Sequence, residues 1–142
     1  MPVVDASVVV DWVAPGAGID APSVTLLGRL AAEDAELVAP RLLVEEVSNA
    51  LLTGIRRGRW TGVEADAAHD VLRRLPIRLV DDARDLERAW DLARRSDNHP
   101  IDDMLYVALA ERRQLQLITA DRALRQVLAR FAWVISPEQF LG

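Results

Sequence analysis

Four acidic residues lie far apart in the sequence, and each borders a short apolar segment. They are Asp5, Glu46, Asp103 and Asp121. A carboxylate is costly to place against an apolar core unless another group compensates its charge. Four converging carboxylates are compensated most simply by a divalent cation, and oxygen ligands of this kind suit Mg²⁺ or Mn²⁺. The first hypothesis is therefore a metal-dependent enzyme.

Three of these positions also have a simpler interpretation. Asp5 and Asp121 directly follow predicted strands, where aspartate commonly caps the next helix. Both also lie at the carboxyl end of a strand, where ligands bind in parallel sheets, and this shared position favours the ligand interpretation. Asp102 and Asp103 begin a predicted helix, where carboxylates complement the helix dipole. Periodicity does not decide which of these two faces a cation.

Helix geometry separates Glu46 from its neighbour Glu45. Glu46 and Asn49 lie one turn apart at the edge of the apolar side of a predicted helix at residues 42–57, whereas Glu45 points to water. We therefore expect Glu46 to face the site, and Asn49 either to support the site by a hydrogen bond or to cap a loop. The apolar side itself is formed by Leu43, Val47, Ala50 and Leu51.

The elements that must position these acids follow from the apolar pattern. Short β-branched segments predict strands at residues 2–4, 37–39, 77–80, 116–119 and 132–135. Longer periodic segments predict helices at residues 6–12, 23–33, 42–57, 61–75, 83–95, 101–113 and 123–129. Ser23 and Thr61 are predicted N-caps, and Glu64 completes a capping box with Thr61. This alternation predicts an α/β fold with a mostly parallel sheet and helices on both faces.

Length and composition narrow the class of protein. The 142 residues are about half apolar and about a quarter charged, which is typical of a single globular domain. No apolar segment approaches the roughly 18 residues needed to span a bilayer, and the N-terminus lacks a signal-peptide pattern. The absence of cysteine excludes disulfides and thiolate zinc sites. We therefore expect a cytoplasmic protein.

The charge pattern is acidic overall but contains arginine clusters. Net charge is −5, and all seventeen basic residues are arginines, which can bind phosphate groups bidentately. Arg56 and Arg57 follow the helix that carries Glu46, so they either border the site and bind RNA or form a solvated helix end. His69 and His99 are the minimum for metal-free RNA cleavage; His69 fits a surface position, and His99 lies in a polar loop near Asp102.

Four segments carry a family resemblance over nearly the whole chain. They are Asp5-Ala6-Ser7, the segment 46–51, the segment 103–110 and Thr119-Ala120-Asp121. These segments resemble those of the PIN-domain nucleases, and the length is most similar to that of the VapC toxins of type II toxin–antitoxin modules.

This resemblance implies a PIN-like α/β/α sandwich over residues 1–142 and an endoribonuclease that depends on Mg²⁺ or Mn²⁺. It implies that Asp5, Glu46, Asp103 and Asp121 are both catalytic residues and metal ligands, and it favours Asp103 over Asp102. The residues implied as supports are Ser7, Asn49, Thr119 and Asp102. The implied partners are an RNA substrate and a VapB-like antitoxin.

Two other functions are compatible with the sequence, and its apolar residues predict an assembly state. The chain could be another metal-dependent phosphodiesterase, such as a DNA nuclease, or a catalytically idle PIN-like interaction module. The intact set of four acids argues against the idle module. Apolar side chains expected on the surface also predict a homodimer. These side chains are Trp12, Trp60, Val63, Val71 and Leu72.

Overall fold

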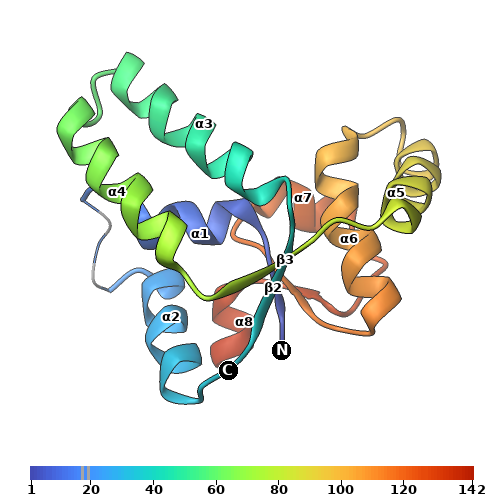
Figure 1. Cartoon of the computed structure of the whole chain (residues 1–142). Coiled ribbons are helices and arrows are strands. Elements are labelled where there is room, and N and C mark those ends of the chain that lie inside the picture. The colour runs from blue at the N-terminus through green and yellow to red at the C-terminus, as the bar shows by residue number, and fades with distance from the viewer. Residues whose placement is uncertain (17, 19) are drawn as a thin grey trace.

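The computed structural model describes residues 1–16, 18 and 20–142, and its helices surround a central parallel sheet (Figure 1). The strand order is β3-β2-β1-β4-β5, and each neighbouring pair is parallel. The prediction of an α/β fold with a mostly parallel sheet is therefore confirmed. The strands are β1 (Val3–Val4), β2 (Leu37–Pro40), β3 (Ile77–Val80), β4 (Leu117–Ile118) and β5 (Val134–Ile135).

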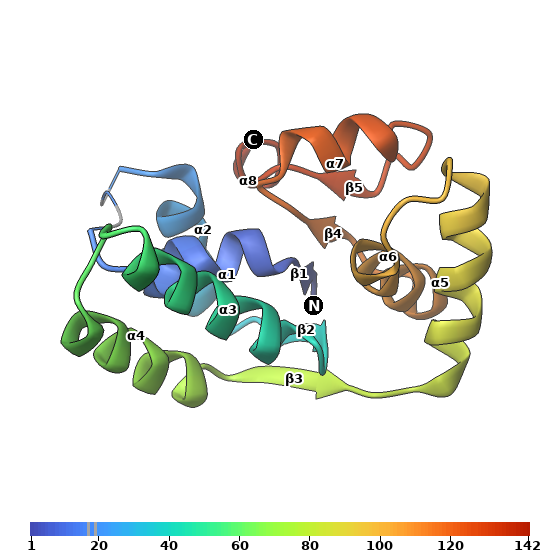
Figure 2. The same ribbon diagram turned by 90° about the horizontal axis from the view of Figure 1, so that it is seen from above.

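Helices cover both faces of this sheet. In both ribbon views α1 to α4 lie on one side of the strands, and α5 and α6 lie on the other (Figures 1 and 2). None of the helices in the described residues is both long and apolar enough to cross a membrane. The helices are α1 (Ala6–Val13), α2 (Pro22–Ala32), α3 (Leu43–Arg56), α4 (Gly62–Arg74), α5 (Ala83–Arg95), α6 (Ile101–Arg113), α7 (Arg122–Val127) and α8 (Pro137–Leu141).

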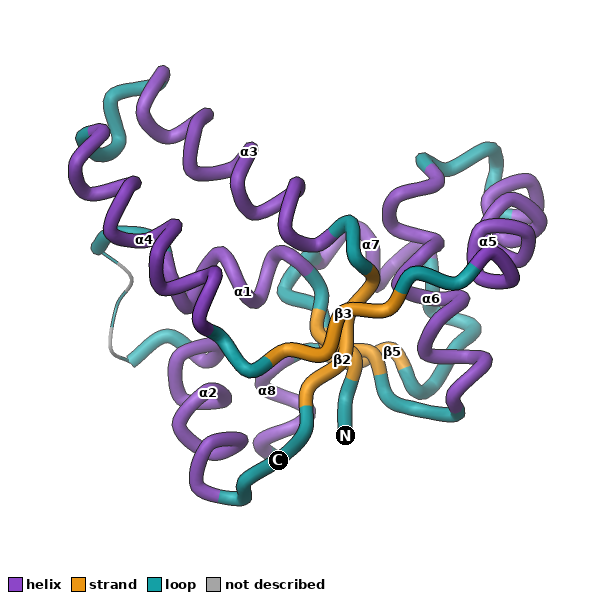
Figure 3. The backbone as a smooth tube through the Cα atoms, viewed as in Figure 1, coloured by secondary structure: helices purple, strands orange, loops and turns teal. Residues whose placement is uncertain are grey.

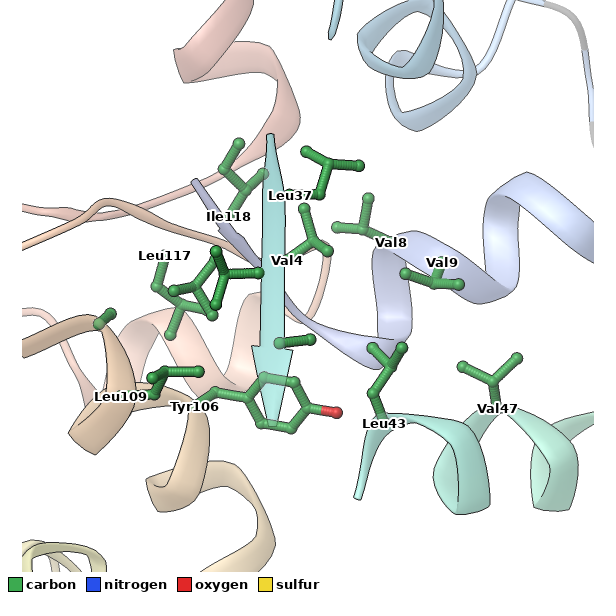
Figure 4. Close-up of a cluster of buried hydrophobic side chains, with 14 of the residues drawn as sticks. Val4, Val8, Val9, Leu37, Leu43, Val47, Tyr106, Leu109, Leu117 and Ile118 are labelled. Carbon is green, nitrogen blue, oxygen red and sulfur yellow. The ribbon is translucent and has the colours of Figure 1, made fainter. Parts of the chain in front are cut away.

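The core forms where the central strands meet the inner faces of the helices. The strands are short and gather at the centre of the molecule, while helices make up most of the chain (Figure 3). β1, β2 and β4 are buried along their whole length, as expected for strands covered on both faces. Figure 4 shows that Val4 of β1 and Ile118 of β4 lie among side chains of α1, α3 and α6. Strand ends and helix starts are thereby held firmly at one edge of the sheet.

One predicted helix cap is wrong. α2 begins at Pro22 after the N-cap residue Ala21, not at Ser23. Proline suits the first helical turn because its missing N–H group has no helical partner there. Ser23 is instead buried, and its carbonyl oxygen accepts a hydrogen bond of 2.6 Å from the Trp12 indole.

Two capping boxes define other helix starts. The predicted box of Thr61 and Glu64 is confirmed at the start of α4. A second box, between Ser136 and Gln139, begins the short helix α8, which the sequence analysis did not predict. The residue types of this second box, Ser followed three positions later by Gln, are a recognisable start signal in the sequence.

The predicted set of exposed apolar residues is partly wrong. Leu72 is buried, and Trp12 and Trp60 are half-buried because each indole donates a hydrogen bond to a backbone carbonyl. Val63 and Val71 are exposed, as expected. Exposed apolar side chains outside the predicted set include Leu52 on α3 and, on α5, Leu86 and Trp90, which are 55% and 64% exposed.

Candidate active site

Asp5 lies at the carboxyl edge of the sheet, directly after β1, and is only 5% exposed. Its Oδ2 accepts hydrogen bonds from Ser7 Oγ at 2.7 Å and from Thr119 Oγ1 at 2.8 Å. Its backbone N–H donates to the carbonyl oxygen of Ile118 at 3.0 Å. These bonds join the ends of β1 and β4 and fix the Asp5 carboxylate.

The two hydroxyl groups are themselves held by the backbone. Ser7 Oγ accepts a hydrogen bond of 3.0 Å from the Ala120 N–H, and Thr119 Oγ1 accepts one of 3.1 Å from the Asp121 N–H. Arg125 Nη1 donates to the carbonyl oxygen of Thr119 at 2.7 Å. Ser7 in the first turn of α1 and Thr119 directly after β4, both predicted as supports, therefore contact Asp5 directly.

Glu46 enters the same region from the first turn of α3. It is half-buried, and its Oε1 accepts a hydrogen bond of 2.6 Å from the hydroxyl of Tyr106 on α6. Glu45 has the opposite orientation: it is exposed and forms an ion pair of 2.7 Å with Arg41. The difference in orientation expected from helix geometry is therefore present.

Asp103 reaches the site from the first turn of α6. It is half-buried, and its Oδ2 lies 2.7 Å from His99 Nε2. Asp102 is exposed. Within the described residues, the polar loop before α6 thus provides a hydrogen-bond partner for Asp103 but none for Asp102.

Electrostatic coupling shows that these acids share one environment. Burial raises the pKa of the Asp5 carboxyl, and the charge of Asp103 adds to this effect, whereas the hydrogen bonds from Ser7 and Thr119 oppose it. Burial also raises the pKa of Glu46 to about 7, and the charges of Asp5, Asp102 and Asp103 contribute to this rise. It is therefore costly to ionise Asp5 and Glu46 together without a counter-charge.

The carboxylate oxygens of the site are ligands of the type that Mg²⁺ and Mn²⁺ prefer. Asp5, Glu46 and Asp103 each use one carboxylate oxygen to accept hydrogen bonds from a side chain. Oε2 of Glu46 has no such bond within the described residues and is reached by solvent, because every fully buried side-chain oxygen or nitrogen there has a partner. Among those residues no three Asp, Glu or His side chains already form a metal-binding group, so cation binding would require these side chains to move closer together.

Asp121 lies at the edge of this arrangement. It is exposed, and its Oδ1 accepts a hydrogen bond of 3.1 Å from the Leu124 N–H, which makes it the N-cap of α7. Its backbone connects to Asp5 only through the Thr119 hydroxyl. Asn49 is also exposed, one turn beyond Glu46, and its side chain forms no hydrogen bond within the described part of the chain.

Arg56 and Arg57 do not border the acids. They lie at the far end of α3, whose first turn carries Glu46, and ten residues of helix correspond to about 15 Å along the axis. The expectation that they flank the site is therefore wrong. They remain exposed and lie next to the turn that leads to α4.

A cavity of about 610 Å³ lies at the carboxyl ends of β2 and β3, and its lining includes Glu45 but none of the four predicted site acids. Leu42, which lines it, is one helical turn before Glu46, and Leu105, which also lines it, is three residues after Asp102. The cavity therefore adjoins the starts of α3 and α6 but is not lined by the site acids themselves.

Two residues of the site were not predicted from the sequence to contact the acids. Tyr106 is the only tyrosine of the chain and lies three residues after Asp103 on an apolar helix. A buried tyrosine normally finds a partner for its hydroxyl, so this position was a readable signal, but the partner on α3 was not. His99 stands four residues before Asp103, and only the loop conformation brings its ring to that carboxylate.

The sequence and the fold are similar to those of known proteins. The PIN domain family model matches residues 3–129. PAE2754 from Pyrobaculum aerophilum superposes with a TM-score of 0.70 at 22% identity, covering 98% of this chain and 85% of that one. VapC20 of Mycobacterium tuberculosis, described as a sarcin–ricin loop cleaving toxin, gives 0.66 at 22% identity, covering 94% and 98%.

A third solved structure, FitAcB from Neisseria gonorrhoeae, gives a TM-score of 0.65 at 17% identity, covering 97% of this chain and 99% of that one. A comparison with curated proteins gave no match. The family model spans most of the sequence, including the segments of Asp5, Glu46, Asp103 and Asp121, and the parallel sheet has the same fold as these structures. The chain therefore belongs to the PIN domain family.

Proposed function

We propose that residues 1–142 form a single PIN-like domain that cleaves RNA as an endoribonuclease dependent on Mg²⁺ or Mn²⁺. The observation that carries this proposal is the mutual electrostatic influence of Asp5, Glu46 and Asp103 at the carboxyl edge of the sheet of a PIN domain. In the proposed role the protein is the toxin of a type II toxin–antitoxin module and acts in the cytoplasm.

The proposed cation ligands are Asp5, Glu46, Asp103 and Asp121. A bound cation of this class lowers the pKa of water and neutralises charge on a phosphodiester. The chain's own contribution is to hold its carboxylates: Ser7 and Thr119 fix Asp5, and His99 contacts Asp103. In-line attack by water would leave 5′-phosphate and 3′-hydroxyl ends and needs no ribose 2′-hydroxyl as nucleophile.

Support for the toxin role comes from the structural neighbours. VapC20 is described as a toxin that cleaves the sarcin–ricin loop, and the fold is shared with this chain over most of both lengths. We propose a VapB-like antitoxin as partner and a homodimer as the assembly state.

Purified protein should cleave RNA when Mg²⁺ or Mn²⁺ is added, and cleavage should stop in excess chelator. Asp5→Asn should abolish cleavage without loss of fold, as judged by circular dichroism. Glu46→Gln should lower the rate by at least about 100-fold, whereas Glu45→Gln, its matched control, should retain it. Undiminished cleavage in chelator, or equal rates for the two glutamine variants, would contradict the proposed site.

The biological role has a separate test. Expression of the chain alone should arrest bacterial growth, and co-expression with the product of an adjacent small reading frame should restore it. The Asp5→Asn protein, expressed to the same level, is the control and should be harmless. Normal growth with the folded wild-type protein would argue against a toxin but not against the nuclease.

A further inference from the structure

Within the described residues, one side-chain hydrogen bond joins α3 to α6 at the candidate active site. Tyr106 on α6 is fully buried, and its hydroxyl donates to Oε1 of Glu46 on α3 at 2.6 Å. Figure 4 shows the Tyr106 ring lying in the core with its hydroxyl directed toward the start of α3, near Leu43. α3 and α6 lie on opposite sides of the strands (Figure 2).

The Glu46 side chain needs such a restraint. It is half-buried in the first turn of α3 and carries a charge that Asp5, Asp102 and Asp103 repel. A glutamate side chain has several rotatable bonds, so repulsion alone would turn it away from the other acids. Hydrogen bonds to an ionised acceptor are about twice as strong as neutral ones, and they therefore oppose this movement.

The geometry also leaves part of the carboxylate available. Tyr106 binds only Oε1, while Oε2 forms no hydrogen bond with the described residues and is open to solvent. Asp103 lies three residues before Tyr106, so both project from nearly the same face of α6. This one helix therefore positions two acids, Asp103 by its own backbone and Glu46 through the tyrosine hydroxyl.

We propose that Tyr106 is a positioning residue that holds Glu46 toward Asp5 and Asp103 so that Oε2 is available to a divalent cation. This inference rests on the proposed function, and it adds a residue outside the acids to the machinery of the site. Tyr106 itself does not contact the cation or the substrate.

Removal of the hydroxyl alone tests the proposal. Tyr106→Phe keeps the ring in the core, and we expect its affinity for Mn²⁺, measured by electron paramagnetic resonance without RNA, to fall by about 10-fold or more. Val107→Ala is the control on the same helix, because Val107 is fully buried but contacts no acid by hydrogen bond. It should lower the melting temperature and leave Mn²⁺ affinity unchanged.

A double-variant cycle identifies the route of the effect. If Tyr106 acts through Glu46, Tyr106→Phe should not weaken Mn²⁺ binding further in a Glu46→Ala background. Additive losses in the double variant would show an independent effect of the ring and would overturn the proposed route.

The single tyrosine also provides a spectroscopic readout. Protein labelled with ¹³Cζ-tyrosine should give one resonance from Tyr106, and titration with Mg²⁺ should shift it because the charge on Glu46 becomes shared with the cation. A tyrosine with a purely structural role would keep its resonance unchanged.

The outcomes separate the inference from the proposed function. Wild-type protein that binds Mn²⁺ and cleaves RNA, together with a Tyr106→Phe protein whose affinity is within about twofold of wild type, would overturn the inference alone. Wild-type protein that neither binds Mn²⁺ nor cleaves RNA would overturn both.

Discussion

At the scale of single residues, the site differs from the rest of the surface in how its carboxylates are partnered. Within the described residues, arginines form ion pairs with Asp82, Asp85 and Glu111, but not with Asp5, Glu46 or Asp103. Those three acids accept hydrogen bonds from hydroxyl groups or a histidine. Although the sequence contains seventeen arginines, none of these three acids is paired with one within the described residues. Their charge is therefore available for neutralisation by another cation.

The raised pKa of Glu46 predicts an unusual dependence of stability on pH. Its pKa rises from the ordinary 4.5 to about 7, so between these values the folded state binds more protons than the unfolded state. Stability of the metal-free protein should therefore fall as pH rises through this window. Thermal unfolding should show that stability declines less with pH in Glu46→Gln than in the wild type. Mg²⁺ added near neutral pH should restore the stability of the wild-type protein. Identical pH profiles for the two proteins would refute the assignment to Glu46.

The two interpretations of Asp121 can be separated by its substitutions. Asparagine also accepts the Leu124 N–H, so Asp121→Asn should keep the stability of the α7 cap, whereas Asp121→Ala should lose about 1 kcal/mol. If Asp121 is also a cation ligand, both variants should cleave RNA more slowly. Chemical denaturation measures the first effect and a cleavage assay the second. Full activity of Asp121→Asn would show that Asp121 is only a helix cap and not a cation ligand.

At the scale of elements, α3 is held in place by its contact with the turn that precedes α4. A Cβ atom at Gly54 would overlap Cζ2 and Cε2 of Trp60, whose indole also donates to the Leu51 carbonyl at 2.9 Å. Gly54→Ala should therefore destabilise the protein by about 1–3 kcal/mol. Gly28→Ala, in the exposed middle of α2 with no atom nearby, should stabilise it by about 0.5–1 kcal/mol. Denaturant unfolding of the two variants should give opposite signs.

The arginines at the end of α3 could bind RNA only at a distance from the acids. Replacement of Arg56 and Arg57 by glutamine should weaken binding of long RNA and reduce the slope of log affinity against log salt by about 0.7 for each lost phosphate contact. RNA of a few nucleotides should be unaffected. Arg94 and Arg95, exposed at the end of α5, provide the control pair. Equal losses for both pairs would indicate a general charge effect.

At the scale of the whole molecule, an exposed apolar pair on α5 is where we expect two copies to meet. Leu86 and Trp90 lie one turn apart on α5 and line a groove of about 650 Å³ with Ile101. Trp90→Asp should convert the expected homodimer to monomer in analytical ultracentrifugation, because a charge would be buried at the interface. Val63→Asp, at an exposed position of α4, should leave the dimer intact. The reverse result would move the interface to α4.

Local sequence patterns determined most of the elements. Alternation of short β-branched and longer periodic segments was sufficient to predict the parallel α/β fold, because buried parallel strands and amphipathic helices have distinct periods. The Thr61–Glu64 box fixed the start of α4 in the same way. The inward orientation of Glu46 and the outward orientation of Glu45 followed from the angle between consecutive helical residues.

Only the tertiary structure decided which groups meet. Periodicity could not separate Asp102 from Asp103, because both lie in a first turn; only the structure shows that Asp102 is exposed and that Asp103 is half-buried beside His99. Neither could it reveal that Tyr106 meets Glu46, sixty residues away, or that Arg56 and Arg57 lie far from the acids. Sequence pattern reports which face of an element is buried, whereas contacts between elements depend on how the helices pack across the sheet.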